Sequence, residues 1–145
     1  MMDELVQILR NGNHSLVVAS DGIRTFDGRG ISDLYTLLTE HPDWLRGASV
    51  ADKVVGKGAA ALLVSGGVKE VHADVISRPA FDLLESTGVP TTYEKMVPYI
   101  INRADTGLCP LEIRCKECVT PEECLVQIRL FVEEMNSVRS KLNKS

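Results

Sequence analysis

The sequence predicts an α/β fold in which helices cover a mixed β-sheet. Two short β-rich runs near the N-terminus are separated by Asp21-Gly22, and helix-like and strand-like segments alternate after them. Strands joined by a tight turn are antiparallel, whereas strands joined through a helix run parallel. A hairpin followed by helix, strand, helix and strand therefore indicates a layered sandwich whose sheet contains both kinds of pairing.

Local signals place the elements of this sandwich. We expect, in chain order, a helix over 3–11, strands over 16–20 and 23–26, a helix capped by Ser32 that ends at His41-Pro42, a strand or helix start over 49–55, a helix over 56–64, a strand over 68–76, a helix from Ser77 that stops at Gly88, and a strand over 91–95. The Asp-Gly dipeptide supplies the positive φ angles of a two-residue hairpin turn. Serine is a preferred helix cap because its hydroxyl accepts a free backbone N–H.

A long C-terminal helix is expected over residues 121–142. The run Thr120-Pro121-Glu122-Glu123 has a Thr cap, a Glu three residues later and a Pro at the first helical position, which is the pattern of a capping box. Apolar residues then recur every three or four positions and indicate a face that docks on the domain. They are Leu125, Ile128, Phe131, Val132, Met135, Val138 and Leu142.

Length and composition fit one domain over residues 1–145, with 44% hydrophobic and 25% charged residues. No apolar run approaches the roughly 20 residues that span a bilayer, and the N-terminal Met1-Met2-Asp3-Glu4 is acidic where a secretory signal is basic. We therefore expect a cytoplasmic protein without a membrane partner.

The net charge of −4 and the scatter of the Lys and Arg residues disfavour nucleic acid as a partner. The sequence leaves the oligomeric state open.

Four cysteines fall in one irregular segment, residues 105–124, in the pattern CxxxxxCxxCxxxxxC. They are Cys109, Cys115, Cys118 and Cys124. Thiolates gathered in this way are ligands for a structural zinc or an iron–sulfur cluster, although a zinc motif commonly has two CxxC pairs and this chain has one. Two other interpretations stay open. Cys115 and Cys118 can form a redox dithiol, and Cys124, which adjoins the apolar stripe, can pack in the core.

Four segments resemble a small prokaryotic family of unknown function. They are DKVVGKGAAALL, VKEVHADVIS, VPYIINRADT and CPLE, in this order. The resemblance covers nearly the whole chain, and it implies a cytidine-deaminase-like three-layer sandwich with a mixed sheet and a C-terminal helix.

The zinc ligands of a deaminase are missing from the corresponding positions. Such an enzyme needs a His or Cys with a nearby Glu at the start of one helix and a PCxxC at the start of the next. The first helix here begins within residues 52–57, which contain neither His nor Glu, and the second has Ala80 and Leu83 where the two cysteines belong. We therefore expect a deaminase-like domain without zinc-dependent deamination.

Polar residues at two places indicate a cleft for a small anionic or nucleotide-like molecule. Asp52, Lys53 and Lys57 surround an expected helix N-terminus, where free N–H groups and a Gly-flanked lysine suit an anion. Asn102, Arg103 and Asp105 form a second polar group. A solvated loop and a turn are the structural alternatives for the two groups.

Three functions follow from these observations. The first is a ligand-binding or regulatory module that uses the cleft. The second is a metalloprotein that uses the four cysteines. The third is a nonstandard enzyme with Asp52, Lys53 or Cys109 as acid, base or nucleophile, and it ranks last because no base is evidently paired with the thiol.

Overall fold

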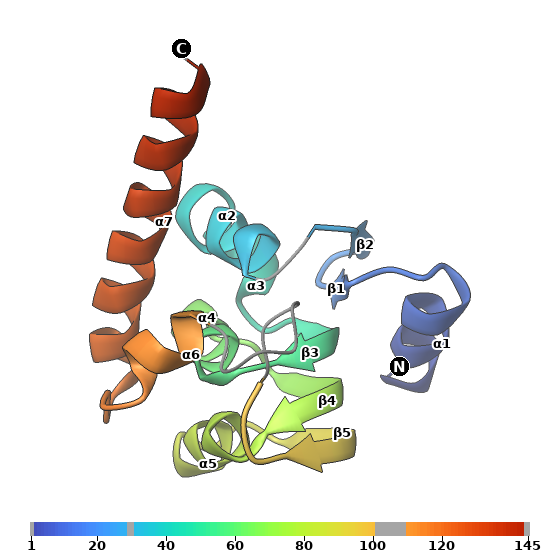
Figure 1. Ribbon diagram of the computed structural model, residues 1–145. Coiled ribbons are helices and arrows are strands. Elements are labelled where there is room, and N and C mark those ends of the chain that lie inside the picture. Colours follow the sequence, from blue (N-terminus) through green and yellow to red (C-terminus); the bar gives the residue numbers. More distant parts are fainter. Residues whose placement is uncertain (1, 29–30, 101–109, 144–145) are drawn as a thin grey trace.

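The computed structural model describes residues 2–28, 31–100 and 110–143 (Figure 1). Within these residues the helices are α1 (Met2–Asn11), α2 (Ser32–Glu40), α3 (Pro42–Leu45), α4 (Lys57–Gly66), α5 (Arg78–Ser86), α6 (Pro110–Cys115) and α7 (Pro121–Asn143). The strands are β1 (Leu16–Ala19), β2 (Ile23–Phe26), β3 (Ser49–Val55), β4 (Glu70–Ser77) and β5 (Thr91–Val97). None of the described helices is both long and apolar enough to cross a bilayer.

The described strands form one mixed sheet in the order β2-β1-β3-β4-β5. Strand β1 is antiparallel to both β2 and β3, whereas β3, β4 and β5 run parallel. The sequence-based expectation of a mixed sheet is therefore confirmed. Because the three parallel strands point the same way, their carboxyl ends lie at one edge of the sheet, and α4 and α5 begin at that edge.

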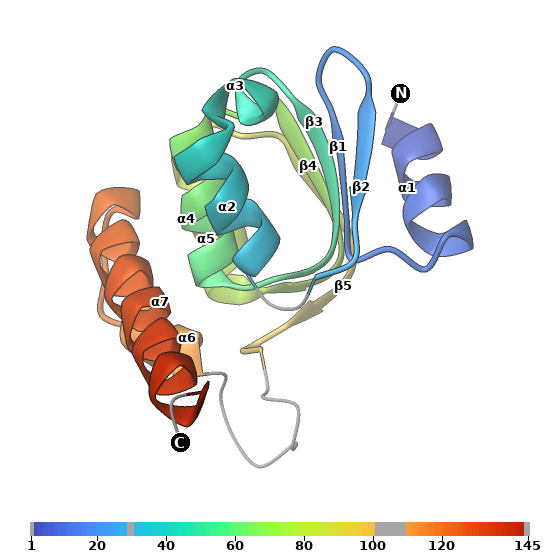
Figure 2. The same cartoon turned by 90° about the horizontal axis from the view of Figure 1, so that it is seen from above.

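Helices cover both faces of the sheet (Figure 2). Helix α1 packs on one face through a small apolar cluster made of Leu5, Leu9, Val17 and Ala51. Helices α2, α4 and α5 lie on the other face over the main core. Helices α6 and α7 form a further layer, because both pack on α4 from outside.

Helix α4 is the central element of the main core. Its residues from Gly58 to Leu63 are buried. Close approach by neighbouring helices explains its small residues, since a Cβ at Gly58 would lie 2.7 Å from Leu111 of α6 and one at Gly66 2.8 Å from Leu45 of α3. Gly67 ends the helix in the left-handed region, with φ of 74°.

The hairpin turn agrees with its sequence signal, but the start of α2 does not. Asp21 and Gly22 both have positive φ, as the Asp-Gly dipeptide predicted. Ser32 is the first residue of α2 rather than its cap, and Ile31 occupies the cap position. Asp33 organises this loop instead, because its Oδ2 accepts the N–H of Gly28 at 2.8 Å.

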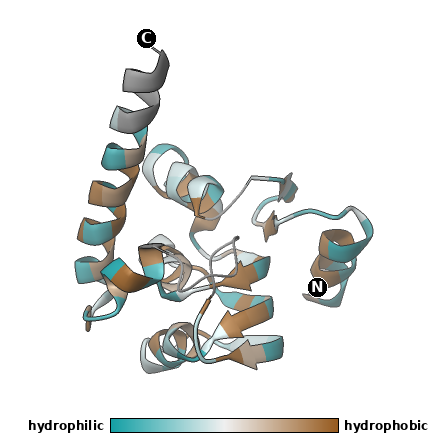
Figure 3. Ribbon diagram, viewed as in Figure 1, coloured by the Kyte–Doolittle hydropathy of each residue, from teal (hydrophilic) through white to brown (hydrophobic). Residues whose placement is uncertain are grey.

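The C-terminal part contains one expected helix and one that the sequence did not predict. The Thr120 cap at the start of α7 is confirmed, since Thr120 Oγ1 accepts the N–H of Glu123 at 3.2 Å, while the Glu123 carboxylate accepts the N–H of Val119, one residue before the cap. Apolar and hydrophilic residues alternate along α7 (Figure 3), and of its apolar stripe Ile128 is fully buried while Met135 is 49% exposed. The side chains of Val138 and Leu142 lie outside the described part of the chain. Helix α6 lies inside the cysteine-rich segment, which had been expected to be irregular.

Candidate functional site

An open pocket of about 540 Å³ lies where the parallel strands end. Each of these strands is followed by a residue that lines it: Lys57 after β3, Arg78 after β4 and Tyr99 after β5. The fourth side comes from the turn between α6 and α7. The remaining lining residues are Pro79, Asp82, Leu83, Ser86, Pro98, Cys118 and Val119.

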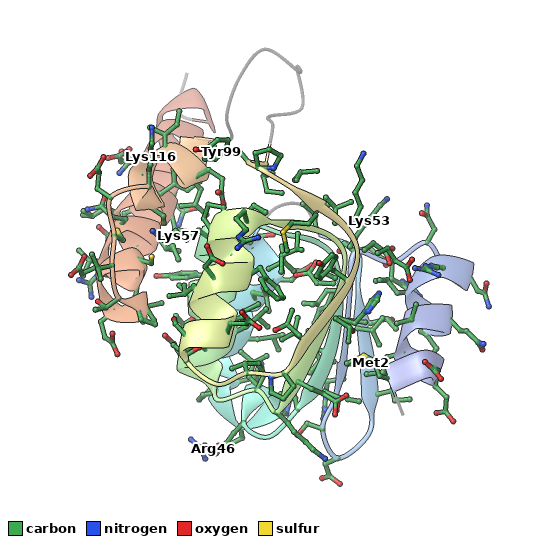
Figure 4. The ribbon with its side chains drawn as sticks, turned by 90° about the horizontal axis from the view of Figure 1, so that it is seen from below. Met2, Arg46, Lys53, Lys57, Tyr99 and Lys116 are labelled. Carbon is green, nitrogen blue, oxygen red and sulfur yellow. The ribbon has the colours of Figure 1, made fainter. Side chains whose placement is uncertain are left out.

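Lys57 is the first residue of α4 and joins that helix to the α6–α7 turn. Its ammonium group donates hydrogen bonds to the backbone carbonyl of Cys118 and, at 3.4 Å, to that of Lys116. Figure 4 shows Lys57 on the same side of the molecule as Lys116 and Tyr99. An ammonium group has a further N–H beyond these two bonds, so Lys57 can also donate to a ligand.

Arg78 is the first residue of α5 and lies directly after the cap of that helix. Ser77 Oγ accepts the N–H of Ala80 at 3.2 Å, as the sequence predicted. The Nε of Arg78 is 3.1 Å from Asp82 Oδ1, and both side chains are more than half exposed. An exposed pair of this kind contributes little to stability, so the guanidinium can exchange Asp82 for another anion.

The N-terminus of α4 is already occupied by a carboxylate of the chain itself. Glu112 of α6 is only 7% exposed, and its Oε1 accepts the N–H of Lys57 at 2.6 Å. Burial raises the pKa of Glu112. This role of Glu112 was not predicted from the sequence. The signal was present, because two of the segments that carry the family resemblance, DKVVGKGAAALL and CPLE, are the two that meet here.

The first predicted group of ligand-binding residues does not stay together. Lys57 lines the pocket, but Asp52 does not, because it lies in the middle of β3 and is 8% exposed. Burial raises the pKa of Asp52 to about 7. Lys53 is exposed and lies on a different side of the molecule from Lys57 (Figure 4). The second predicted group, Asn102, Arg103 and Asp105, lies outside the described residues.

Three of the four cysteines come together beside the pocket. Cys115 and Cys124 are completely buried, whereas Cys118 is half-buried and lines the pocket. The pKa of Cys124 is raised by its interaction with Cys115 and by burial. Over residues 2–28, 31–100 and 110–143, no three His, Cys, Asp or Glu side chains are arranged to hold a metal ion. Cys109 lies outside these residues.

Fold and pocket together define an α/β protein with a mixed five-stranded sheet and an open pocket at the edge where its parallel strands end. Residues 4–132 match the family described as "TM1506: Domain of unknown function (DUF1893)", and the chain belongs to this family. The crystal structure of a DUF1893 family protein from Thermotoga maritima is similar, with a TM-score of 0.82 and 28% sequence identity over 92% of this chain and 88% of that one. No curated protein matches the sequence.

Proposed function

We propose that this protein is a binding module for a small anionic molecule, held in the pocket at the carboxyl edge of its parallel strands. The observation that carries the proposal is the convergence of Lys57, Arg78 and Tyr99, one from the end of each parallel strand, on the same pocket. Ligands of open α/β sheets bind outside the carboxyl ends of the strands, where loops from several strands meet.

Charge supports an anion as the ligand. Lys57 and Arg78 are cationic, and Arg78 is also the first residue of α5, so its side chain lies at the positive end of that helix dipole. Asp82 is the single carboxylate among the lining residues, and it is paired with Arg78. The exposed ring of Tyr99 and the exposed side chain of Val119 offer apolar surface beside these charges, which suits an anion with a planar or apolar part.

Melting temperature measured with a panel of anions tests this function. Inorganic phosphate, pyrophosphate and nucleoside monophosphates are added at constant ionic strength, and a ligand at a hundredfold excess over its Kd stabilises the fold by about 2.7 kcal/mol. We expect saturable stabilisation by at least one probe, and its loss in Arg78→Ala. The matched control is Arg46→Ala, which removes the same charge at the opposite end of the molecule (Figure 4). Equal stabilisation of both variants, or none of the wild type, would overturn the proposal.

We propose further that the fold is related to that of the cytidine deaminases but does not catalyse zinc-dependent deamination. The mixed sheet between helical layers supports the relationship. Ala80 and Leu83, at the positions of two deaminase zinc ligands, are buried among apolar residues of the main core. Incubation with cytidine and adenosine in the presence of zinc should leave both substrates unchanged, and zinc-dependent release of ammonia would contradict this.

A second candidate function is a cysteine-bound zinc or iron–sulfur centre. The grouping of Cys115, Cys118 and Cys124 within ten residues supports it, and Cys109 would be the fourth ligand. Anaerobic purification followed by metal analysis and a visible absorption spectrum tests it. Stoichiometric metal that is lost in Cys118→Ser would support the centre, whereas metal-free protein with four titratable thiols would exclude it.

A further inference from the structure

The three described cysteines differ in their access to solvent, although Cys115 and Cys124 belong to the main core and Cys118 packs against it. Cys115 is the last residue of α6 and Cys124 lies in the first turn of α7, and both are completely buried. Cys118 lies between the two helices in a non-helical turn and reaches the pocket. A small oxidant that enters the pocket therefore meets Cys118 first.

Cys118 has a second thiol within reach. Its thiol donates to the carbonyl oxygen of Arg114 at 3.9 Å, and the pKa of Cys118 is raised by burial and by Cys124, which is near enough to contribute. Redox-sensitive cysteines commonly combine an accessible thiol of low pKa with a neighbouring thiol that can resolve its oxidised form, and Cys118 shares the access and the neighbour.

We propose that Cys118 is a modification site for hydroperoxides, and that its oxidation forms a disulfide with Cys124. In the first step the Cys118 thiolate attacks one peroxide oxygen, an S–O bond forms, the O–O bond breaks, and the leaving hydroxide takes up a proton to become water. In the second step the Cys124 sulfur attacks the Cys118 sulfenic acid, the S–S bond forms, and the hydroxyl group leaves as a second water molecule. Two thiols are oxidised and one hydrogen peroxide is reduced.

The position of Cys118 in the turn selects it over Cys115 as the reacting thiol. The side chain of Cys115 belongs to the main core, beneath α6 and α7. Cys118 instead lies in the turn 116–119, where it lines the pocket, and the carbonyls of Lys116 and Cys118 hold this turn to Lys57.

Access to Cys118, rather than a lowered pKa, accounts for the selectivity, because burial raises the pKa of Cys118. The inference does not depend on the proposed anionic ligand.

Digestion with trypsin distinguishes a Cys118–Cys124 disulfide from a Cys118–Cys115 disulfide. Cleavage after Lys116 and Arg129 leaves Cys118 and Cys124 in one peptide, residues 117–129, and cleavage after Arg114 and Lys116 leaves Cys115 in a dipeptide. The protein is reduced, treated with hydrogen peroxide, alkylated and digested, with Cys109→Ser as the background. We expect the 117–129 peptide to be lighter by about 2 Da and free of alkylation. Attachment of the Cys115 dipeptide, or two alkylated cysteines within 117–129, would overturn the proposal.

Matched variants separate the role of Cys118 from a general sensitivity to oxidation. Cys118→Ser, a change at a half-buried turn residue, should abolish peroxide-dependent loss of free thiols on the same time scale, while Cys115→Ala should leave the 117–129 disulfide intact. Cys124→Ala should stop the reaction at the Cys118 sulfenic acid, which a dimedone probe labels. Dimedone labelling of Cys115 instead would contradict the assignment, and circular dichroism checks that each variant is folded.

Discussion

The backbone N–H of Lys57 donates a hydrogen bond to Glu112 Oε1 across 2.6 Å, although the two residues are 55 positions apart in the sequence. The carboxylate of Glu112 thereby acts as the N-cap of α4, which has no cap from its own residue Gly56. This bond fastens α6 to the central helix of the core and leaves the Lys57 side chain to face the pocket.

Removal of Glu112 should therefore destabilise the whole domain. We expect Glu112→Ala to lower the free energy of unfolding by about 1–3 kcal/mol, because the part-buried N–H of Lys57 loses its acceptor. Glu112→Gln retains a carbonyl oxygen and should cost less. Urea unfolding followed by circular dichroism measures both changes, and Glu117→Ala is the control at an exposed position of the same segment. Equal losses for Glu112→Ala and Glu117→Ala would show that the bond contributes nothing.

The requirement for glycine at position 56 should depend on Glu112. A Cβ at Gly56 would lie 2.1 Å from Glu112 Oε1, so the carboxylate would have to move and give up its bond to Lys57. We expect Gly56→Ala to cost about 1–3 kcal/mol in the wild type, and clearly less in the Glu112→Ala background. A double-mutant cycle of unfolding free energies measures this coupling. Strict additivity of the two changes would refute the contact.

Stability should fall as the pH rises towards neutral because of Asp52. Burial raises its pKa from 3.8 to about 7, so between these values the folded chain holds a proton that the unfolded chain releases. The free energy of unfolding should decrease over this range, by up to about 4 kcal/mol from Asp52. Asp52→Asn should flatten the dependence of the unfolding free energy on pH. Part of the slope should remain, because burial also raises the pKa of Glu112. Denaturant unfolding at several pH values tests this, with the exposed Asp21→Asn as control. An unchanged slope in Asp52→Asn would contradict the assignment.

The capping box should make a measurable contribution to α7. Thr120→Ala removes the acceptor for the Glu123 N–H and should cost about 1 kcal/mol of unfolding free energy, whereas Thr120→Ser keeps a hydroxyl and should cost little. Glu123 Oε2 accepts the N–H of Val119 at 3.0 Å, so Glu123→Ala should also destabilise the helix start. Equal destabilisation by Thr120→Ser and Thr120→Ala would show that the hydrogen bond of the Thr120 hydroxyl does not stabilise α7.

Local sequence signals were sufficient to predict most of the fold. Asp21-Gly22, Ser77 and Thr120 each bring their own turn or cap chemistry, and that chemistry does not depend on distant residues. Helix α6 could not be predicted in the same way. It has six residues, and its place depends on Leu111, which packs against Gly58 of α4, a contact that no local pattern reveals.

The candidate site was predicted only in part for a similar reason. Lys57 was found because it lies between two glycines at a helix start. Arg78 and Tyr99 were missed because each follows a different strand, and only the parallel order of β3, β4 and β5 brings them to the same pocket. Asp52 and Lys53 were included for their nearness in sequence to Lys57, but strand β3 carries them away from it.

A backbone amide NMR titration with pyrophosphate at constant ionic strength tests the central claim, an anion pocket at the ends of the parallel strands, most directly. We expect saturable chemical-shift changes at Arg78, Tyr99 and Val119, and none at Arg46. In Asp82→Asn the affinity should increase, because Arg78 loses its competing carboxylate. Shifts that are absent, that scatter over the surface, or that are as large at Arg46 as at Arg78 would contradict the claim.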